Sequence, residues 1–296
     1  MHHLVSVPLD PKVAEYMGKR GSQNSITFYD RKTGGDTIVA MAPTSIGEKF
    51  YAAAESMMLA EQVVMGTANP DRLFGEVLLG CALLKKRVIF TDDTDVDQLV
   101  GGSGILDYEK CGKEELLDRI TKYRGPGGGG AARVDIDKAF PVKGLGTVAL
   151  GIVTSGTVRK HDELHHSSGK MVSVRSIQSQ DVDVDEAETG TRLGMVLKGI
   201  EHDEIVKGDL LTHQPSGKVR DAKISMELGG IAKESVAAGN RYYAVSNFTY
   251  TAVKVESTDG TEAVVSFEKA VALLKGDSLL MLRDRIPRIF ALGRVL

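Results

Sequence analysis

The sequence predicts an α/β domain followed by two antiparallel β-barrels. Up to residue 124, short apolar runs alternate with helical patterns, which is typical of a mostly parallel sheet. From residue 131 the predicted strands are short, glycine recurs every few residues, and no segment has a convincing 3.6-residue period. The 296 residues suggest about two domains at roughly 150 residues each, or three if some are small barrels.

In the first domain, helices and strands alternate along the chain. The run Lys32 to Gly35 has the composition of a hairpin turn, and Asp71 can cap the helix that follows it. We expect strands over 4–8, 26–29, 37–41, 62–65, 87–90 and 104–108, and helices over 12–18, 47–59, 71–84 and 114–123.

Two breaks divide the chain. Residues 125–130 are all glycine except Pro126, which indicates a flexible linker. A phosphate-binding loop would need a helix after the glycines, whereas 131–135 looks like a strand. A second break at 215–217 gives three domains, 1–124, 131–214 and 215–296. In the last of them we expect strands over 242–245, 251–256, 263–267, 278–282 and 288–292.

Composition excludes several classes of protein. The chain has 42% hydrophobic residues, which suits a globular protein, and only two cysteines, Cys81 and Cys111, too few for a disulfide framework. No apolar run approaches the length of a membrane span and the start lacks an export signal, so we expect a cytoplasmic protein with no membrane partner. The net charge of −3 argues against holding nucleic acid by bulk charge, and we expect no DNA partner. Residues 215–296 are nevertheless basic, with 12 Lys+Arg against 9 Asp+Glu.

The middle segment carries a family resemblance. Residues 140–148 read FPVKGLGTV, 155–158 read SGTV, 174–179 read VRSIQS, and 207–211 read KGDLL. In this order and spacing, residues 134–211 strongly resemble the second domain of translational GTPases of the elongation factor Tu type. The selenocysteine-specific and archaeal members look closest. Residues 288–295 resemble the final strand of that family's third domain.

The resemblance implies a reduced P-loop-GTPase-like α/β domain followed by two antiparallel β-barrels. Small barrels need glycines or bulges at their corners, so we expect Gly144, Gly146, Gly156 and Gly194 to lie where strands bend.

The family's nucleotide motifs are degenerate in the first domain. No G-x-x-x-x-G-K-[S/T] is present, and the nearest text, Gly18 to Ser22, follows a helix-like stretch. In the place of D-x-P-G stand Met41 and Thr44, and in the place of N-K-x-D the segment from Thr91 to Asp95 keeps only the last carboxylate. We therefore expect a pseudo-GTPase that is not an enzyme and has no cofactor.

The resemblance also implies an RNA-binding surface for tRNA or the ribosome. The candidate residues are the polar side chains that could face RNA in the two barrels: Lys143, Arg175, Gln178, Arg192, Lys218, Arg220, Arg283, Arg285 and Arg288. Each could equally be an ordinary surface charge.

Histidines do not indicate a metal site. His165 and His166 are neighbours on a predicted strand and so point to opposite faces, and no cysteine is near them or His161. Two alternatives to the pseudo-GTPase remain open. One is an active GTP-binding elongation factor with a divergent site, and the other is a protein–protein adaptor that does not bind RNA.

Overall fold

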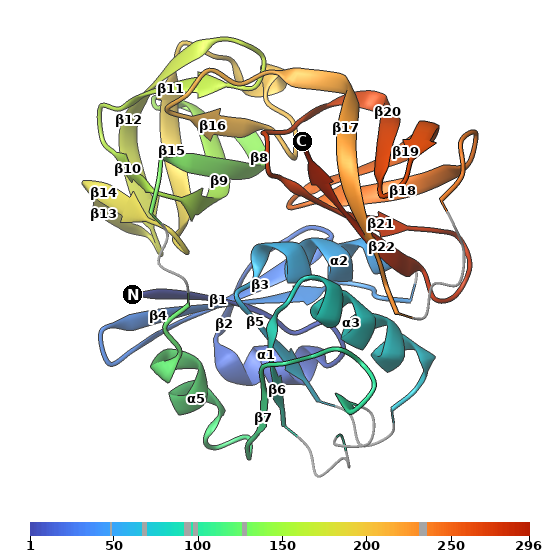
Figure 1. Cartoon of the computed structure of the whole chain (residues 1–296). Coiled ribbons are helices and arrows are strands. Elements are labelled where there is room, and N and C mark those ends of the chain that lie inside the picture. Colours follow the sequence, from blue (N-terminus) through green and yellow to red (C-terminus); the bar gives the residue numbers. More distant parts are fainter. Residues whose placement is uncertain (48, 67–69, 92–95, 97–99, 126–128, 231–235) are drawn as a thin grey trace.

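The computed structural model describes residues 1–47, 49–66, 70–91, 96, 100–125, 129–230 and 236–296. It contains an α/β domain with two β-barrels side by side above it (Figure 1). The predicted fold class is confirmed. Among the described residues, no helix is long and apolar enough to cross a membrane.

A seven-stranded sheet forms the centre of the α/β domain. Its order is β2-β3-β4-β1-β5-β6-β7, in which neighbours from β4 to β7 are parallel and β2 and β3 are antiparallel to their neighbours. The strands are β1 (His2–Ser6), β2 (Lys19–Gln23), β3 (Ile26–Thr33), β4 (Asp36–Pro43), β5 (Gln62–Met65), β6 (Arg87–Phe90) and β7 (Tyr108–Lys110). The two-residue turn between β3 and β4 has positive φ at Gly34 and Gly35, as a type I′ turn requires.

Helices cover both faces of this sheet. They are α1 (Pro11–Met17), α2 (Phe50–Leu59), α3 (Arg72–Leu83) and α5 (Leu116–Lys122). α1 and α5 pack into one apolar cluster with the sheet, whereas α2 and α3 pack on the face that looks toward the barrels (Figure 1). The cap predicted for α3 is confirmed, because the Asp71 carboxylate accepts a hydrogen bond from Phe74 N at 2.9 Å.

In this domain one predicted strand was wrong and one strand was missed. Residues 104–107 are not a strand, and the edge strand β7 begins only at Tyr108. Residues 19–23 form the exposed edge strand β2, which the sequence did not predict because its polar residues lack alternating hydrophobicity. The segment from Gly18 to Ser22 is therefore mainly a strand beside β3 and not a phosphate loop.

The first barrel has six strands that close on themselves. Its order is β11-β16-β8-β9-β15-β12, closed by pairing of β11 with β12, and β13 extends β12 at one edge. The elements are β8 (Arg133–Val142), β9 (Gly146–Ser155), β10 (Thr157–Arg159), β11 (Glu163–His166), β12 (Met171–Ser179), β13 (Val182–Val184), β14 (Glu186–Glu188), β15 (Arg192–Lys198), η1 (His202–Glu204) and β16 (Leu210–Thr212).

The second barrel is closed in the order β17-β20-β19-β18-β21-β22. Its strands are β17 (Lys218–Leu228), β18 (Arg241–Ser246), β19 (Thr249–Asp259), β20 (Glu262–Ala272), β21 (Ser278–Leu282) and β22 (Ile289–Val295). The five predicted strands are confirmed as β18 to β22. β17, with few buried positions and five charged side chains, was not predicted.

Glycines turn the barrel strands at three of the four expected positions. Gly144, Gly146 and Gly156 have positive φ and lie between strands or at a strand end. Gly194 was predicted wrongly as a corner, because it lies inside β15, paired with Gln178 and Leu150. Of the 125–130 linker, residues 126–128 lie outside the described residues.

Apolar clusters join the first domain to the barrels. One continuous core contains residues of α2 and α3 together with Val245, Leu280, Leu282, Ile289 and Leu292 of the last barrel. A smaller core contains residues of β1, β3, β4 and α2 with one residue from each barrel, Ile152 and Phe248.

Candidate functional site at the junction of the three domains

The connection between β1 and α1 is short, and polar groups at both of its ends are already bonded. It consists of Val7 to Asp10, and Val7 is fully buried, with its N–H bonded to Met41 O at 2.8 Å. α1 begins with Pro11, which has no N–H, and the Asp10 carboxylate accepts the hydrogen bond from Lys12 N at 2.9 Å. A carboxylate therefore lies where a helix N-terminus would otherwise attract an anion.

The degenerate motif positions have structural partners. Met41 is fully buried in the core that joins the domains. The Thr44 hydroxyl donates to Asn24 O at 2.8 Å and ties the end of β4 to the β2–β3 turn. Thr91 N donates to Met65 O at 3.2 Å, which extends the hydrogen bonding between β5 and β6 by one residue. Asp95 lies outside the described residues.

Two candidate RNA-binding arginines face the first domain instead of solvent. Arg192 Nη2 donates to Ser22 Oγ at 2.6 Å, Nη1 lies 3.7 Å from Asp30 Oδ2, and the guanidinium lies 4.2 Å from the Phe28 ring centre. Burial raises the pKa of Asp30, and Arg192 partly offsets this rise. Arg192 therefore joins the first barrel to the first domain in this structure, and its contact with RNA stays a prediction.

Arg288 joins the first domain to the last barrel. Its Nη2 lies 2.6 Å and its Nε 3.1 Å from Glu76 Oε2, and the backbone N–H of Arg288 also donates to Glu76. Glu76 is only 2% exposed, and the guanidinium stacks 3.9 Å from the Phe50 ring centre. In this structure the Arg288 guanidinium joins the first domain to the last barrel, and its contact with RNA stays a prediction.

Three candidates lie on the outer surface of the first barrel. Lys143 is exposed in the β8–β9 turn, and Arg175 is exposed on β12 at a bulge. Arg175 lines a cavity of about 600 Å³ together with His161 and Lys198. Gln178 is exposed and donates from Nε2 to Asp183 Oδ1 at 2.8 Å.

The remaining candidates lie on the last barrel. Arg283 and Arg285 line a shallow cavity of about 390 Å³, and Arg283 Nε donates to Pro287 O at 2.8 Å. Arg220 is exposed on β17, with Nη1 3.4 Å from Glu268 O. The structure does not gather these residues into one site.

Lys218 instead lies in a cavity that all three domains line. This junction cavity, about 440 Å³, lies between α2, the 206–209 loop of the first barrel and strands β17, β19 and β20 of the second. Tyr51 of α2 stacks on Tyr250 of β19 with ring centres 4.5 Å apart, and Tyr250 is 41% exposed. Its described lining is Tyr51, Glu55, Val206, Lys207, Gly208, Asp209, Lys218, Phe248, Thr249, Tyr250, Thr251, Lys269, Ala270, Val271 and Ala272.

Sequence reasoning missed the most buried charges of this cavity. Lys207 Nζ lies 2.8 and 2.7 Å from the two carboxylate oxygens of Glu55, which is 1% exposed, and 2.9 Å from Ser25 Oγ. Glu55 lies in an α2 segment rich in alanine and methionine. A single charge on such an apolar helix is the sequence feature that could have marked it as a buried, paired carboxylate.

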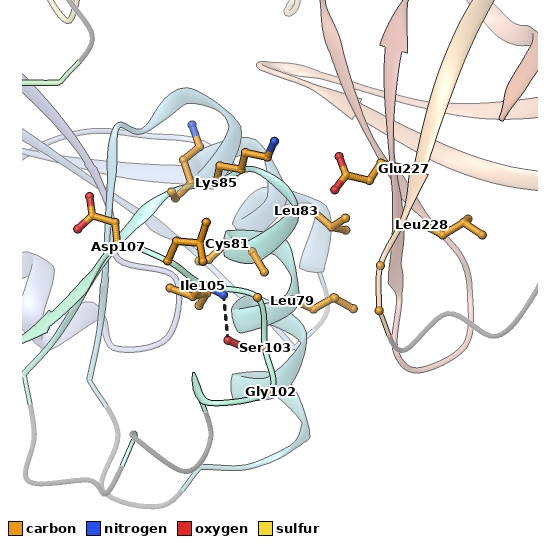
Figure 2. A pocket seen from close by; sticks show the side chains of 16 residues that line it. Leu79, Cys81, Leu83, Lys85, Gly102, Ser103, Ile105, Asp107, Glu227 and Leu228 are labelled. Carbon is orange, nitrogen blue, oxygen red and sulfur yellow. Dashed lines mark hydrogen bonds between the residues drawn. The ribbon is translucent and has the colours of Figure 1, made fainter.

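An apolar cleft of about 330 Å³ lies elsewhere between the first domain and the last barrel. Figure 2 shows Leu79 and Leu83 of α3 pointing toward β17, where Glu227 lies on the near side and the Leu228 side chain points away, with Ile105 beside the helix. Ile105 N donates to Ser103 Oγ at 3.2 Å and fixes the adjoining loop. No group of three or more His, Cys, Asp or Glu suited to a metal ion occurs among the described residues.

Known proteins share the barrel sequence and the whole architecture. The family model Elongation factor Tu domain 2 matches residues 146–212. The selenocysteine-specific elongation factor of Methanocaldococcus jannaschii is 28% identical over 66% of this chain and 47% of its own length. The crystal structure of translation elongation factor SelB from Methanococcus maripaludis, in complex with the GTP analogue GppNHp, superposes with a TM-score of 0.82. It is 18% identical and is matched over 100% of this chain and 79% of its own.

The resemblance to translational GTPases of the elongation factor Tu type is confirmed. This elongation factor Tu-like chain also has a relative of nearly equal extent. An uncharacterized protein of Methanocaldococcus jannaschii is 27% identical over 95% of this chain and 94% of its own length. In contrast, the chain spans about half the length of the selenocysteine-specific elongation factor that it matches.

Proposed function

We propose that this elongation factor Tu-like chain is a non-enzymatic, RNA-binding pseudo-GTPase of translation, with tRNA or the ribosome as its partner. The observation that carries the first half of this proposal is the β1–α1 connection. Its four residues offer no glycine loop, Pro11 lacks an N–H, and Asp10 caps the helix with a negative charge that would repel a phosphate.

The described residues of the first domain offer little else that could bind a nucleotide. The carboxylate that would lie near Mg²⁺ is replaced by Met41, which is fully buried in an apolar core. The hydroxyl of Thr44 is engaged with the β2–β3 turn. The first domain is then a scaffold on which the two barrels are mounted.

The junction cavity supports RNA as the ligand. It presents Lys207, Lys218 and Lys269, which can contact phosphate, beside the partly exposed Tyr250. The Tyr250 ring is already stacked against Tyr51 and Tyr243, so its exposed edge is the part that can contact RNA. Related proteins named as elongation factors make tRNA or the ribosome the natural partner to test.

Binding of tRNA as a function of salt tests this proposal. We expect affinity to fall steeply with salt, and Lys218→Ala to weaken binding and lower the slope of log K against log salt by about one. Lys122→Ala, which removes an exposed lysine paired with Asp118 on α5, is the matched control and should change neither. Failure to bind tRNA or ribosomes even at low salt would favour an adaptor that does not bind RNA.

A further inference from the structure

Two lysines enter the junction cavity in the same way. Lys207 and Lys218 are each 27% exposed, and each forms an ion pair with a carboxylate that is 1% exposed. Lys207 Nζ lies 2.7 Å from Glu55 Oε2, and Lys218 Nζ lies 2.6 Å from Asp209 Oδ1. Both lysines and both carboxylates line the cavity, and in each pair the carboxylate is the more deeply buried partner.

The two carboxylates differ in what else they bind. Asp209 accepts hydrogen bonds from Ser167 Oγ and from Val206 N, both at 3.0 Å, and lies 3.1 Å from His166 Nε2. Burial opposes ionisation, but the bonds from His166 and Lys218 outweigh it and hold the pKa of Asp209 below its usual value. Asp209 therefore stays ionised around neutral pH.

Glu55 has fewer donors and a like charge nearby. Besides Lys207 it accepts only a 3.2 Å bond from Ser25 Oγ among the described contacts. Burial raises the pKa of Glu55 to about 7, Lys207 offsets part of this rise, and the neighbouring Asp137 adds to it.

Other charged groups complete the surroundings of Glu55. Asp137 of β8 is 5% exposed, burial raises its pKa, and Lys207, Arg192 and Lys138 partly offset that rise. Its Oδ2 has no hydrogen-bond partner among the described residues. On the cavity side, burial and then Glu55 raise the pKa of Tyr51.

We propose that the junction cavity binds a phosphate group of RNA with the uptake of one proton, because Lys207 exchanges Glu55 for the phosphate. This inference rests on the proposed function for the identity of its ligand. The proton comes from solvent and adds to the Glu55 carboxylate, while Lys207 remains an ammonium ion throughout. Lys218, backed by a permanently ionised Asp209, contributes a contact that does not depend on pH.

Proton uptake follows from the charges around Lys207. With Glu55 ionised, the pair that it forms with Lys207 has no net charge and attracts phosphate weakly. A phosphate brought against Lys207 lies near a buried carboxylate, and that like-charge repulsion is removed when Glu55 takes up a proton. Phosphate and proton therefore bind with positive coupling.

Fluorescence anisotropy with a labelled single-stranded RNA at pH 6 to 8 and constant ionic strength tests the coupling. The RNA should lack a terminal phosphate, because phosphate monoesters titrate near pH 6. We expect the affinity of the unmodified protein to rise about tenfold from pH 8 to pH 6, as one proton is taken up.

Glu55→Gln mimics the protonated side chain and is the decisive variant. It should bind at pH 8 as tightly as the unmodified protein binds at pH 6, with no remaining pH dependence. Glu61→Gln is the matched control. Burial raises the pKa of Glu61 as it does that of Glu55, but Glu61 is only partly buried and does not line this cavity. It should keep the tenfold dependence, and a Glu55→Gln protein that keeps it as well would overturn the proposal.

Sulfate separates this inference from the identity of the ligand, since it does not titrate in this range. Calorimetry in two buffers of different ionisation enthalpy counts the protons taken up on binding. We expect about one proton per sulfate near pH 7.5 for the unmodified protein and none for Glu55→Gln. If sulfate binds with proton uptake but RNA does not bind, the RNA-binding function is refuted and the proton-linked anion site stands. If RNA or sulfate binds without proton uptake, the proton-linked site is refuted.

Discussion

The first domain makes two very different interfaces with the two barrels. Toward the last barrel it shares one continuous apolar core, in which α2 and α3 pack against Leu280, Ile289 and other buried side chains. Toward the first barrel it uses mainly polar contacts, among them Lys207 with Glu55 and Arg192 with Ser22 and Asp30. Within the described parts of the chain, Ile152 is the one residue of the first barrel in an apolar core shared with the first domain.

This difference indicates which parts of the molecule move together. Large apolar interfaces hold domains as one body, whereas smaller polar ones permit relative motion. The first domain and the last barrel should therefore behave as one cooperative unit. The first barrel is the part that should respond to a ligand in the junction cavity.

Removing the Arg288 side chain should have the largest effect. Arg288→Ala leaves Glu76, at 2% exposure, without its counter-charge and removes the cation stacked on Phe50. Breaking a buried ion pair in this way costs about 3–5 kcal/mol. Chemical denaturation measures this loss, and Arg294→Ala, an exposed arginine on the same strand, should stay within about 0.5 kcal/mol of the unmodified protein.

Truncating an apolar side chain in the same interface should rank second. Ile289 is fully buried in the core that spans the first domain and the last barrel. Ile289→Ala should lower the free energy of unfolding by about 3 kcal/mol through lost burial and the cavity left behind. A single denaturation transition should persist. Separate transitions for the two domains in the unmodified protein would contradict a shared folding unit.

The pH dependence of stability should report on the polar interface. Because burial raises the pKa of Glu55 from 4.5 to about 7, the folded protein binds more protons than the unfolded chain between these values. Stability should therefore fall as pH rises from about 4.5 to about 7, by at most roughly 3 kcal/mol from this group. The free energy of unfolding of Glu55→Gln, measured across this pH range, should lack the decrease that Glu55 contributes. Identical pH profiles for the two proteins would refute the raised pKa of Glu55.

Removing Arg192 should have the smallest effect on stability and a local effect on dynamics. The side chain is half-buried and makes one hydrogen bond and one long ion pair with the first domain. We expect Arg192→Ala to cost about 1 kcal/mol. Hydrogen exchange of the amides in β2 should accelerate, while the amides of α3 at the apolar interface should be unaffected. Equal acceleration of hydrogen exchange in β2 and α3 would contradict the difference between the polar and the apolar interface.

Strong periodic segments of the fold were predictable from sequence. The buried strands β5 and β6 and the capped helix α3 lie where apolar runs and Asp71 placed them. The edge strands β2 and β17 were missed, because half-exposed strands with charged side chains carry no clear alternation.

The site was less predictable because it is built from contacts between domains. Arg192 and Arg288 look like any basic residue on a barrel, and only the packed structure shows Asp30 and Glu76 facing them. Lys207 and Glu55 are 152 residues apart in the chain, so no local pattern could pair them. In contrast, the nucleotide motifs of the family can be searched for in the sequence because they are local and ordered along the chain, and their loss stays a prediction.

Equilibrium binding of labelled GTP and GDP in the presence of Mg²⁺ tests the central claim most directly. A first domain with Asp10 and Pro11 at the start of α1 and Met41 buried should bind neither nucleotide, even at high micromolar protein. A low-micromolar dissociation constant for either nucleotide would contradict the account and restore a GTP-binding elongation factor.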